Sequence, residues 1–319
     1  MKLVFNDLSL SLNNFRNTYE SRLKMDEFVK LCQKAVLMGS DRELLTTIES
    51  FELQELSEGY RIFDWLNDKN VSREAQRYLR LLLTKPTKIK FDTPSNIENL
   101  MLGYEFKYDS HDSHGLGLSY LLNGLSLSID SSPQWTSSNL NLEKSWFDEE
   151  IDEISNENVS VNHANNLDTL ETHQQKFEIA KRNSFKNGKE FWDKKIDIHP
   201  NLIFCENAKK HILDLSAKDA LLSNVVKTLS DLDAYASSWS EGDFKSNEVR
   251  GKVTTDSNRT LETYDQERKI ICPDGTIRLF SWHSRVTPRA WRIFFDPDFS
   301  SRKLIIGHIG PKLRTVTDH

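Results

Sequence analysis

The sequence predicts an α+β protein of two domains: a helix-rich N-terminal domain with a few strands, and a C-terminal domain of helices packed on a four-stranded antiparallel sheet. Apolar residues recur at helical spacing through most of the chain, whereas alternating segments separated by turn residues follow one another near the C-terminus. A length of 319 residues exceeds that of a typical single domain. Hydrophobic residues at 37% and charged residues at 28% describe a folded chain that can bury a core.

The N-terminal domain is expected over residues 1–127. Residues 18–38 place several apolar side chains near one helical face, and Gly39 follows as a C-cap. A second helix is predicted for residues 40–50, which begin with a capping-box pattern, and a third for residues 72–83, which end before a Lys-Pro pair. The segments KIKFDT and YEFKYDS alternate enough to be strands.

Residues 128–168 are predicted to be a polar and acidic linker or insertion. Serine and asparagine are frequent there, and the run DEEIDEISNE carries six acids and no base. No apolar period is sustained in this segment. A domain boundary near residue 160 is the economical interpretation, and a long surface insertion within one domain is the alternative.

The C-terminal α+β domain is expected over residues 169–319. Helical patterns cover residues 170–195 and 205–215, and the clearest helix lies at residues 219–239, where apolar residues recur every three or four positions. Four antiparallel strands are then predicted, separated by turns with Pro and Gly: RKIIC, TIRLFSWHSR, AWRIFF and KLIIGHI. In the last strand, alternation places Leu304, Ile306 and His308 on one face.

Composition excludes several classes of protein. The three cysteines, Cys32, Cys205 and Cys272, are widely separated and odd in number, which predicts a reducing compartment rather than a disulfide framework. No apolar run approaches the about 20 residues of a membrane helix, and the N-terminal segment turns polar too early for a signal peptide. We therefore expect a cytoplasmic protein that does not bind a membrane.

Charge is distributed unevenly along the chain. The net charge is −6, yet residues 276–319 contain eight Lys or Arg against three Asp. A basic final segment on an acidic chain predicts either a surface that faces a polyanion or an intramolecular partner for the acidic linker.

The stretch WHSRVTPRAWR, residues 282–292, contains the candidate catalytic residues His283, Arg285 and Arg292. Residues two apart in a strand share a face, so the three side chains gather on one sheet surface if Trp291 faces the helix. Forked guanidinium donors suit phosphate, and an imidazole transfers protons near pH 7. Two other interpretations stay open: the ordinary solvent face of a strand pair, and a non-catalytic contact with nucleic acid or protein.

The order of elements over residues 201–314, two helices followed by four strands, resembles the RelE/ParE-like toxin superfamily. Ribonuclease members of that superfamily cleave ribosome-bound messenger RNA with basic and imidazole or phenol side chains of the sheet, and other members poison gyrase. The resemblance implies that His283 acts as acid and base while Arg285 and Arg292 stabilise phosphate charge without a metal. It equally allows a module that kept the fold and lost the activity.

These observations predict a bacterial effector-like protein whose C-terminal domain engages nucleic acid, RNA favoured, with metal-independent RNA cleavage of toxin–antitoxin or phage-defence type as the candidate activity. The alternative is a non-enzymatic subunit of such an assembly, bound to an inhibitory or assembly protein. The remaining basic residues near the sheet are the candidate nucleic-acid contacts: Arg278, Arg289, Lys303, Lys312 and Arg314.

A weaker candidate is the stretch HDSHGLG, in which His111 and His114 could ligate a metal if the loop were tight. The alternative is a glycine-rich turn that leads into a buried apolar segment. The chain contains no P-loop, no dinucleotide fingerprint and no zincin, kinase or nucleophile-elbow motif. We therefore predict no cofactor and no assigned metal site.

Overall fold

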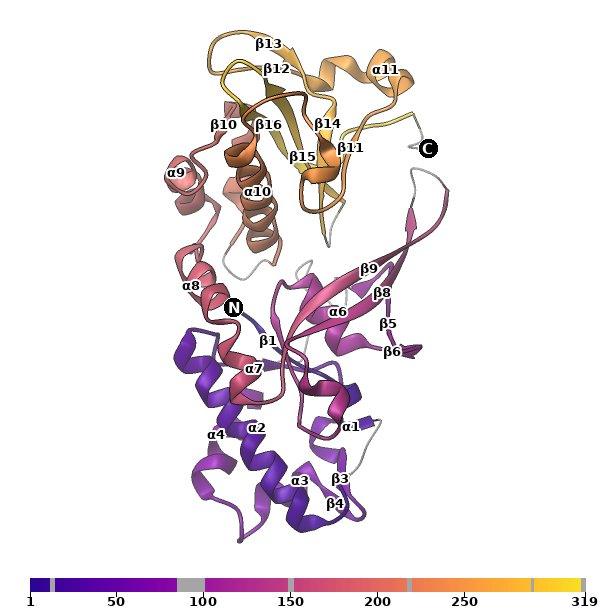
Figure 1. Ribbon diagram of the computed structural model, residues 1–319, viewed down its shortest axis with the longest axis vertical. Helices are drawn as coiled ribbons and strands as arrows, with labels where there is room; N and C mark the ends of the chain where they lie inside the picture. Colours follow the sequence, from indigo (N-terminus) through magenta and orange to yellow (C-terminus); the bar gives the residue numbers. More distant parts are fainter. Residues whose placement is uncertain (12–14, 85–100, 149–151, 217–219, 288–289, 317–319) are drawn as a thin grey trace. The chain divides into compact units, whose positions relative to one another are not determined.

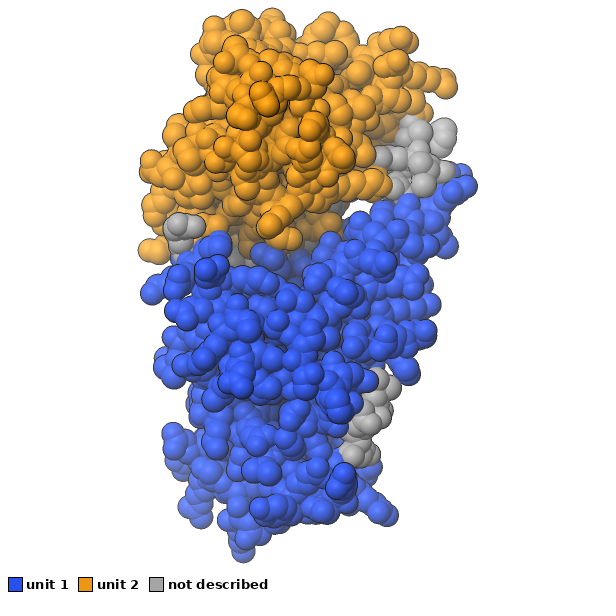
Figure 2. Space-filling model, in the orientation of Figure 1, with its two compact units in different colours: residues 1–182 blue, residues 183–319 orange. Residues whose placement is uncertain are grey.

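The computed structural model describes residues 1–11, 15–84, 101–148, 152–216, 220–287 and 290–316. The chain divides into two compact units, Met1–Arg182 and Asn183–His319, which Figure 2 colours blue and orange. Each unit contains helices and strands, as the α+β prediction requires (Figure 1).

The first unit is built on a seven-stranded sheet with the strand order β2-β1-β7-β9-β8-β5-β6. Its strands are β1 (Leu3–Phe5), β2 (Leu44–Leu45), β5 (Tyr104–Tyr108), β6 (His111–Asp112), β7 (Leu125–Leu127), β8 (Asn139–Asp148) and β9 (Glu153–Ala164). Strands β2, β1, β7 and β9 are parallel to their neighbours, and β8, β5 and β6 extend the sheet with antiparallel pairing. This sheet corrects the prediction of a helix-rich domain with a few strands.

The polar segment predicted as a linker or insertion over residues 128–168 is largely a long β-hairpin within the first unit. Strands β8 and β9 pair over ten residues, from Asn139 opposite Asn162 to Asp148 opposite Glu153. Exposed and less exposed residues alternate along much of β9, so many of its side chains face solvent. The polar composition therefore reflects an exposed sheet face, and the two compact units divide after Arg182 instead.

The helices of the first unit agree with the sequence in part. They are α1 (Leu8–Ser11), α2 (Thr18–Met38), α3 (Ile62–Asn67), α4 (Arg73–Thr84), α6 (His114–Leu121), α7 (Leu167–Glu171) and α8 (Gln174–Arg182), with the 3-10 turns η1 (Phe51–Leu53) and η2 (Pro133–Thr136) and the hairpin β3 (Glu55–Ser57) and β4 (Tyr60–Arg61). Helices α2 and α4 form as predicted, and α2 ends at Gly39, whose φ is 116°. Residues 40–50 do not form the predicted helix, because Leu44 and Leu45 pair with β1 as a buried edge strand. The predicted strand KIKFDT lies outside the described residues.

The second unit contains a five-stranded sheet with the order β10-β16-β15-β14-β11 (Figure 1). Its strands are β10 (Leu202–Phe204), β11 (Val253–Thr255), β14 (Trp282–Val286), β15 (Trp291–Asp298) and β16 (Lys303–Pro311). Strand β10 is parallel to β16, and the other neighbours are antiparallel. The predicted four-stranded antiparallel sheet is therefore wrong. Its first strand, β12 (Lys269–Ile271), pairs with β13 (Ile277–Leu279) in a separate two-stranded sheet, and β10 and β11 take places that the sequence did not indicate.

The helices of the second unit differ in part from those that the sequence patterns suggested. They are α9 (Gly188–Ile198), α10 (Ala220–Ser238) and α11 (Asn258–Arg268), with the 3-10 turns η3 (Glu206–Lys209), η4 (Ile212–Asp214) and η5 (Ser246–Glu248). Helix α10 confirms the pattern at residues 219–239, but the helix predicted at residues 205–215 is replaced by η3 and η4, and α11 was not predicted. Within the described residues, no helix combines the length and apolarity needed to cross a membrane.

Both faces of the five-stranded sheet are covered within the second unit. Helix α10 lies on one face, where Ile293, Phe295 and Ile306 belong to its core. The opposite face carries a smaller apolar core, made of Cys205, Ile270, Cys272, Phe280, Phe294 and Ile305. The hairpin β12–β13 and the turn after it supply part of this second layer, which buries the sheet around Phe294.

Candidate functional site

The strand register places the three predicted catalytic residues on one face of the five-stranded sheet. Arg285 of β14 pairs directly with Arg292 of β15, and His283 pairs with Phe294. Because Ile293 faces α10, its neighbours in β15 face the other way. Alternation in the sequence therefore predicted the common face correctly.

The surroundings of His283 differ from the open surface that was expected. The side chain is 4% exposed and its ring centroid lies 5.0 Å from that of Phe294. Its Nε2 atom lies 3.0 Å from Thr254 Oγ1, and its Nδ1 atom lies 3.9 Å from Asp256 Oδ1. A hydroxyl, a carboxylate and an aromatic ring therefore surround the imidazole, and little of it reaches solvent.

A buried ion pair, which the sequence analysis missed, lies beside this imidazole. Arg268 is fully buried, and its Nε atom donates a hydrogen bond of 2.5 Å to Asp256 Oδ2. Its guanidinium carbon lies 5.6 Å from the centroid of Phe294, and its Nη2 atom donates to the backbone oxygen of Arg314 at 2.9 Å. The contacts of Arg268 thus connect α11 with three other parts of the unit: Asp256, which directly follows β11, strand β15 and the C-terminal segment. In the sequence, the feature that could have indicated this pair was the position of Arg268 close to the apolar residues of β12.

Arg285 and Arg292 form the part of the predicted site whose chemistry suits an anion. Directly opposed residues of an antiparallel pair have Cβ atoms about 4.5–5.5 Å apart, so the two guanidinium groups start close together. Arg292 is 8% exposed and its Nη1 atom donates to the backbone oxygen of Trp291 at 3.0 Å, whereas Arg285 is half-buried. Guanidinium groups bind a phosphate or a carboxylate through forked donors.

His308 joins the same face through a bulge. Strict alternation predicted that His308 shares a face with Leu304 and Ile306, but Phe294 pairs with His308 while the next residue pairs with Ile306, so Gly307 is left out of the register. A Cβ atom at Gly307 would lie 2.5 Å from the ring of Phe280, which explains the glycine. Burial lowers the pKa of His308 to about 4, so this imidazole is neutral at pH 7.

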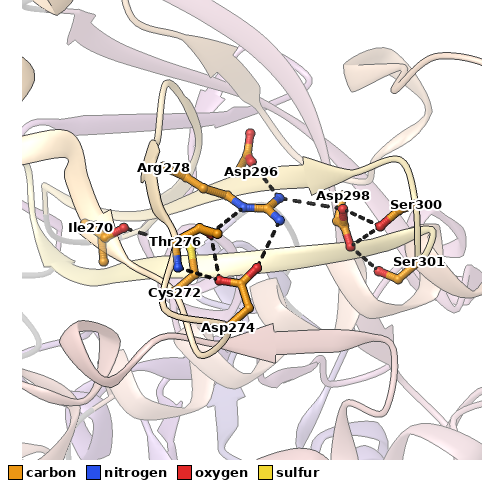
Figure 3. Close-up of polar contacts among 9 residues, drawn as sticks. All are labelled: Ile270, Cys272, Asp274, Thr276, Arg278, Asp296, Asp298, Ser300 and Ser301. Carbon is orange, nitrogen blue, oxygen red and sulfur yellow. Dashed lines mark hydrogen bonds and ion pairs between the residues drawn. The ribbon is translucent and has the colours of Figure 1, made fainter.

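Arg278, predicted to contact nucleic acid, is neutralised by carboxylates instead. Figure 3 shows its guanidinium between three aspartates: the distances are 3.4 Å to Asp274 Oδ2, 3.4 Å to Asp296 Oδ2 and 3.6 Å to Asp298 Oδ1. Burial raises the pKa of Asp296. The pKa of Asp298 is lowered, because hydrogen bonds from Ser301 and Ser300 and the charge of Arg278 outweigh its burial. This cluster carries more negative than positive charge and does not attract a phosphate.

The other predicted basic contacts are also mostly engaged. Arg314 pairs with Glu267 and lies 4.9 Å from the ring centroid of Tyr264. Lys303 donates from Nζ to the backbone oxygen of Pro200 at 2.9 Å, and Lys312 is half-buried. Arg289 lies outside the described residues. The register therefore brings the catalytic candidates together, while the binding candidates do not form one free basic surface.

The weaker metal candidate is split between two elements. His111 belongs to β6 and its Nδ1 atom lies 2.9 Å from the backbone oxygen of Asp109, whereas His114 begins α6, and both side chains are exposed. In the part of the chain that the structure describes, no group of three or more His, Cys, Asp or Glu is arranged to hold a metal ion.

A buried polar network lies where the parallel strands of the first unit end, and the sequence analysis did not select it. Asn6 Nδ2 donates to Ser128 Oγ at 2.9 Å, and Ser128 Oγ lies 2.6 Å from His163 Nε2. The other ring nitrogen of His163, Nδ1, donates to the backbone oxygen of Ser137 at 2.7 Å. A neutral imidazole has one donor and one acceptor nitrogen, so Nε2 accepts a hydrogen bond from the Ser128 hydroxyl. Burial lowers the pKa of His163 to about 4. These three side chains are fully buried, so the serine–histidine pair connects β1, β7 and β9 and does not meet a substrate.

Comparison with known proteins adds no relative to this description. No protein-family model, no curated protein and no solved structure matches the chain. The resemblance to the RelE/ParE-like superfamily therefore remains a prediction.

Proposed function

We propose that the C-terminal unit binds the phosphate groups of nucleic acid, RNA in the first instance, without cleaving them. The observation that carries this proposal is the direct opposition of Arg285 and Arg292 across β14 and β15. The half-buried Arg285 offers a forked donor to one phosphate, and the buried Arg292, 8% exposed, adds positive charge behind it. The preference for RNA over DNA rests on the topological resemblance alone.

The distribution of charge between the two units supports the same conclusion. Residues 183–319 contain 22 Lys or Arg against 19 Asp or Glu, a net charge of +3, whereas residues 1–182 contain 20 against 29, a net charge of −9. A polyanion is attracted by the second unit and repelled by the first. We therefore assign the contact to the second unit.

RNA cleavage is not part of the proposed function, because the catalytic acid and base would have to contact the RNA. Metal-independent RNA cleavage needs a group that takes a proton from the 2′-hydroxyl within hydrogen-bond distance. His283 is 4% exposed, and its Nε2 atom lies beside Thr254. The burial of this imidazole favours binding without chemistry.

The test is the affinity for a fluorescent single-stranded RNA, measured by anisotropy over a range of salt concentrations. Arg285→Gln removes one charge at a half-buried position, and we expect the dissociation constant to rise about tenfold or more. Loss of one phosphate contact should also make the slope of log affinity against log salt shallower by about 0.7. Arg259→Gln, at an exposed arginine of α11, is the matched control. Equal affinity of Arg285→Gln and wild type would reject the proposal, and RNA cleavage lost in His283→Ala would restore the catalytic interpretation.

A protein partner is the second candidate, favoured by one surface. The hairpin β12–β13 turns three apolar side chains to solvent: Ile271 at 66%, Ile277 at 66% and Leu279 at 41% exposure. Apolar side chains gathered on one face of a small sheet are typical of a protein interface. A salt slope near zero would favour this candidate, because protein docking through apolar side chains releases few counterions.

A further inference from the structure

Helix α4 presents a row of arginines at the spacing of one helical face. Arg73, Arg77 and Arg80 are separated by four and three residues, which places them on neighbouring turns of the same side. At a rise of about 1.5 Å per residue the row is about 10 Å long.

The row lines a hollow rather than a convex surface. Residues of α3 and α4 line a volume of about 330 Å³ that is open to solvent: Leu66, Asn67, Arg73, Gln76, Arg77 and Arg80. This volume lies at the lower end of the range for small-molecule sites. The charged side chains of the lining are its three arginines, and no carboxylate is among the lining residues.

Two of its members are held in place by the fold. Arg80 donates from Nη2 to the backbone oxygen of Leu66 at 2.8 Å and to Asn67 Oδ1 at 3.0 Å. Gln76 is buried and its amide nitrogen donates to the backbone oxygens of Trp65 and Asp68. These contacts fix the inner wall of the hollow before any ligand arrives.

The other two arginines are available to a ligand. Arg73 and Arg77 are exposed, and neither forms an ion pair with any residue that the structure describes. Their five-donor forks match the oxygens of phosphate groups in geometry and charge. A fixed inner wall with two free arginines at its rim is the arrangement of an anion site.

We infer that this hollow binds a short chain of linked phosphates, such as an inorganic or nucleotide-borne polyphosphate. A row about 10 Å long exceeds one phosphate and suits two or three that are linked. No aromatic residue lines the hollow, so a nucleobase finds no stacking partner there. The net charge of −9 on residues 1–182 repels a long polyanion, which favours a short ligand over a nucleic-acid strand.

Tripolyphosphate is the probe, titrated calorimetrically into the full chain at low salt. We expect one binding site per chain, an affinity that falls as salt is added, and a dissociation constant raised about tenfold or more by Arg73→Gln and by Arg77→Gln. Both positions are exposed, so the variants should fold, and unchanged thermal unfolding checks this. Arg42→Gln, at an exposed arginine of the same unit outside the hollow, is the matched control and should bind as wild type does.

Two outcomes overturn the inference: no saturable binding of tripolyphosphate, or equal binding by wild type and the Arg73→Gln/Arg77→Gln double variant. A third arm uses the fluorescent RNA, because backbone phosphates share the chemistry of polyphosphate. RNA binding that the double variant loses and that tripolyphosphate does not displace would overturn the commitment to a short ligand. The inference does not rest on the proposed function, since Arg285→Gln should leave tripolyphosphate binding unchanged.

Discussion

The substitution Arg268→Met tests the buried ion pair of the second unit. Arg268 is fully buried and its partner Asp256 keeps 6% of its side chain exposed. Removing one partner of a buried pair costs about 3–5 kcal/mol, because the remaining charge loses its compensation. The guanidinium also donates to the backbone oxygens of Tyr264 and Arg314, and both oxygens lose a donor. We therefore expect the upper part of that range, about 4–5 kcal/mol.

Such a loss is a large part of the total stability of a domain, which is about 5–15 kcal/mol. Urea unfolding at pH 7, followed by tryptophan fluorescence, measures it. The two compact units can unfold in separate steps, so the curve is fitted with two transitions and the change is read from the second unit. Arg259→Met, at an exposed position of the same helix, should change stability by about 0.5 kcal/mol or less.

The double variant Arg268→Met/Asp256→Leu distinguishes a lost ion pair from lost packing. It removes both charges, so it should recover at least about 2 kcal/mol relative to the sum of the single variants. The reasoning is refuted if Arg268→Met costs less than about 1 kcal/mol, or if the double variant costs as much as the two single variants added together. Either result would mean that water or another group compensates Asp256 when the arginine is absent.

Three further predictions concern burial elsewhere in the chain. Ser128→Ala should destabilise the first unit by about 1–3 kcal/mol, because it leaves the buried His163 imidazole without a donor. Ser160→Ala, at an exposed position of β9, the strand of His163, is the neutral control, and equal unfolding midpoints of Ser128→Ala and wild type in urea would contradict the prediction. Burial holds the pKa of His163 and of His308 at about 4, below the usual 6.5, so the unfolded chain binds more protons between these values. Stability present above pH 6.5 should therefore fall by about 3 kcal/mol per histidine as the pH drops to 4, and a flat pH profile of urea midpoints would exclude it. Gly188→Ala should destabilise the second unit by about 3 kcal/mol or more, because the new Cβ would lie 1.6 Å from the backbone oxygen of Ile212 in η4. Thermal unfolding measures this loss, and an unchanged melting temperature would show that η4 moves aside without a free-energy cost.

Elements that carry their own signal could be predicted from the sequence. Helices α2 and α10 each bury an apolar side over about five turns, and α2 is ended by a glycine in the left-handed region. The turn at Gly275, whose φ is 79°, likewise follows from local chemistry. Local periodicity and turn residues determine these elements because their hydrogen bonds and capping groups lie within a few residues of one another.

Elements that exist only through a distant partner could not be predicted. Strand β10 has three residues and depends on parallel pairing with β16, about 100 residues later in the chain. The β8–β9 hairpin has a polar, acidic composition that the sequence alone does not distinguish from a linker. Short parallel strands and exposed sheet faces leave little pattern in a single sequence, since their stability comes from the neighbouring strand.

The candidate site divides in the same way. By itself, the sequence determined that His283, Arg285 and Arg292 share a face, because alternation in a strand is a local property of the backbone. The tertiary structure alone decided what covers that face, because Asp256, Arg268 and the hairpin β12–β13 reach it through contacts between separate elements. Burial depends on every element packed against a residue, so the sequence could not show that only 4% of His283 is exposed.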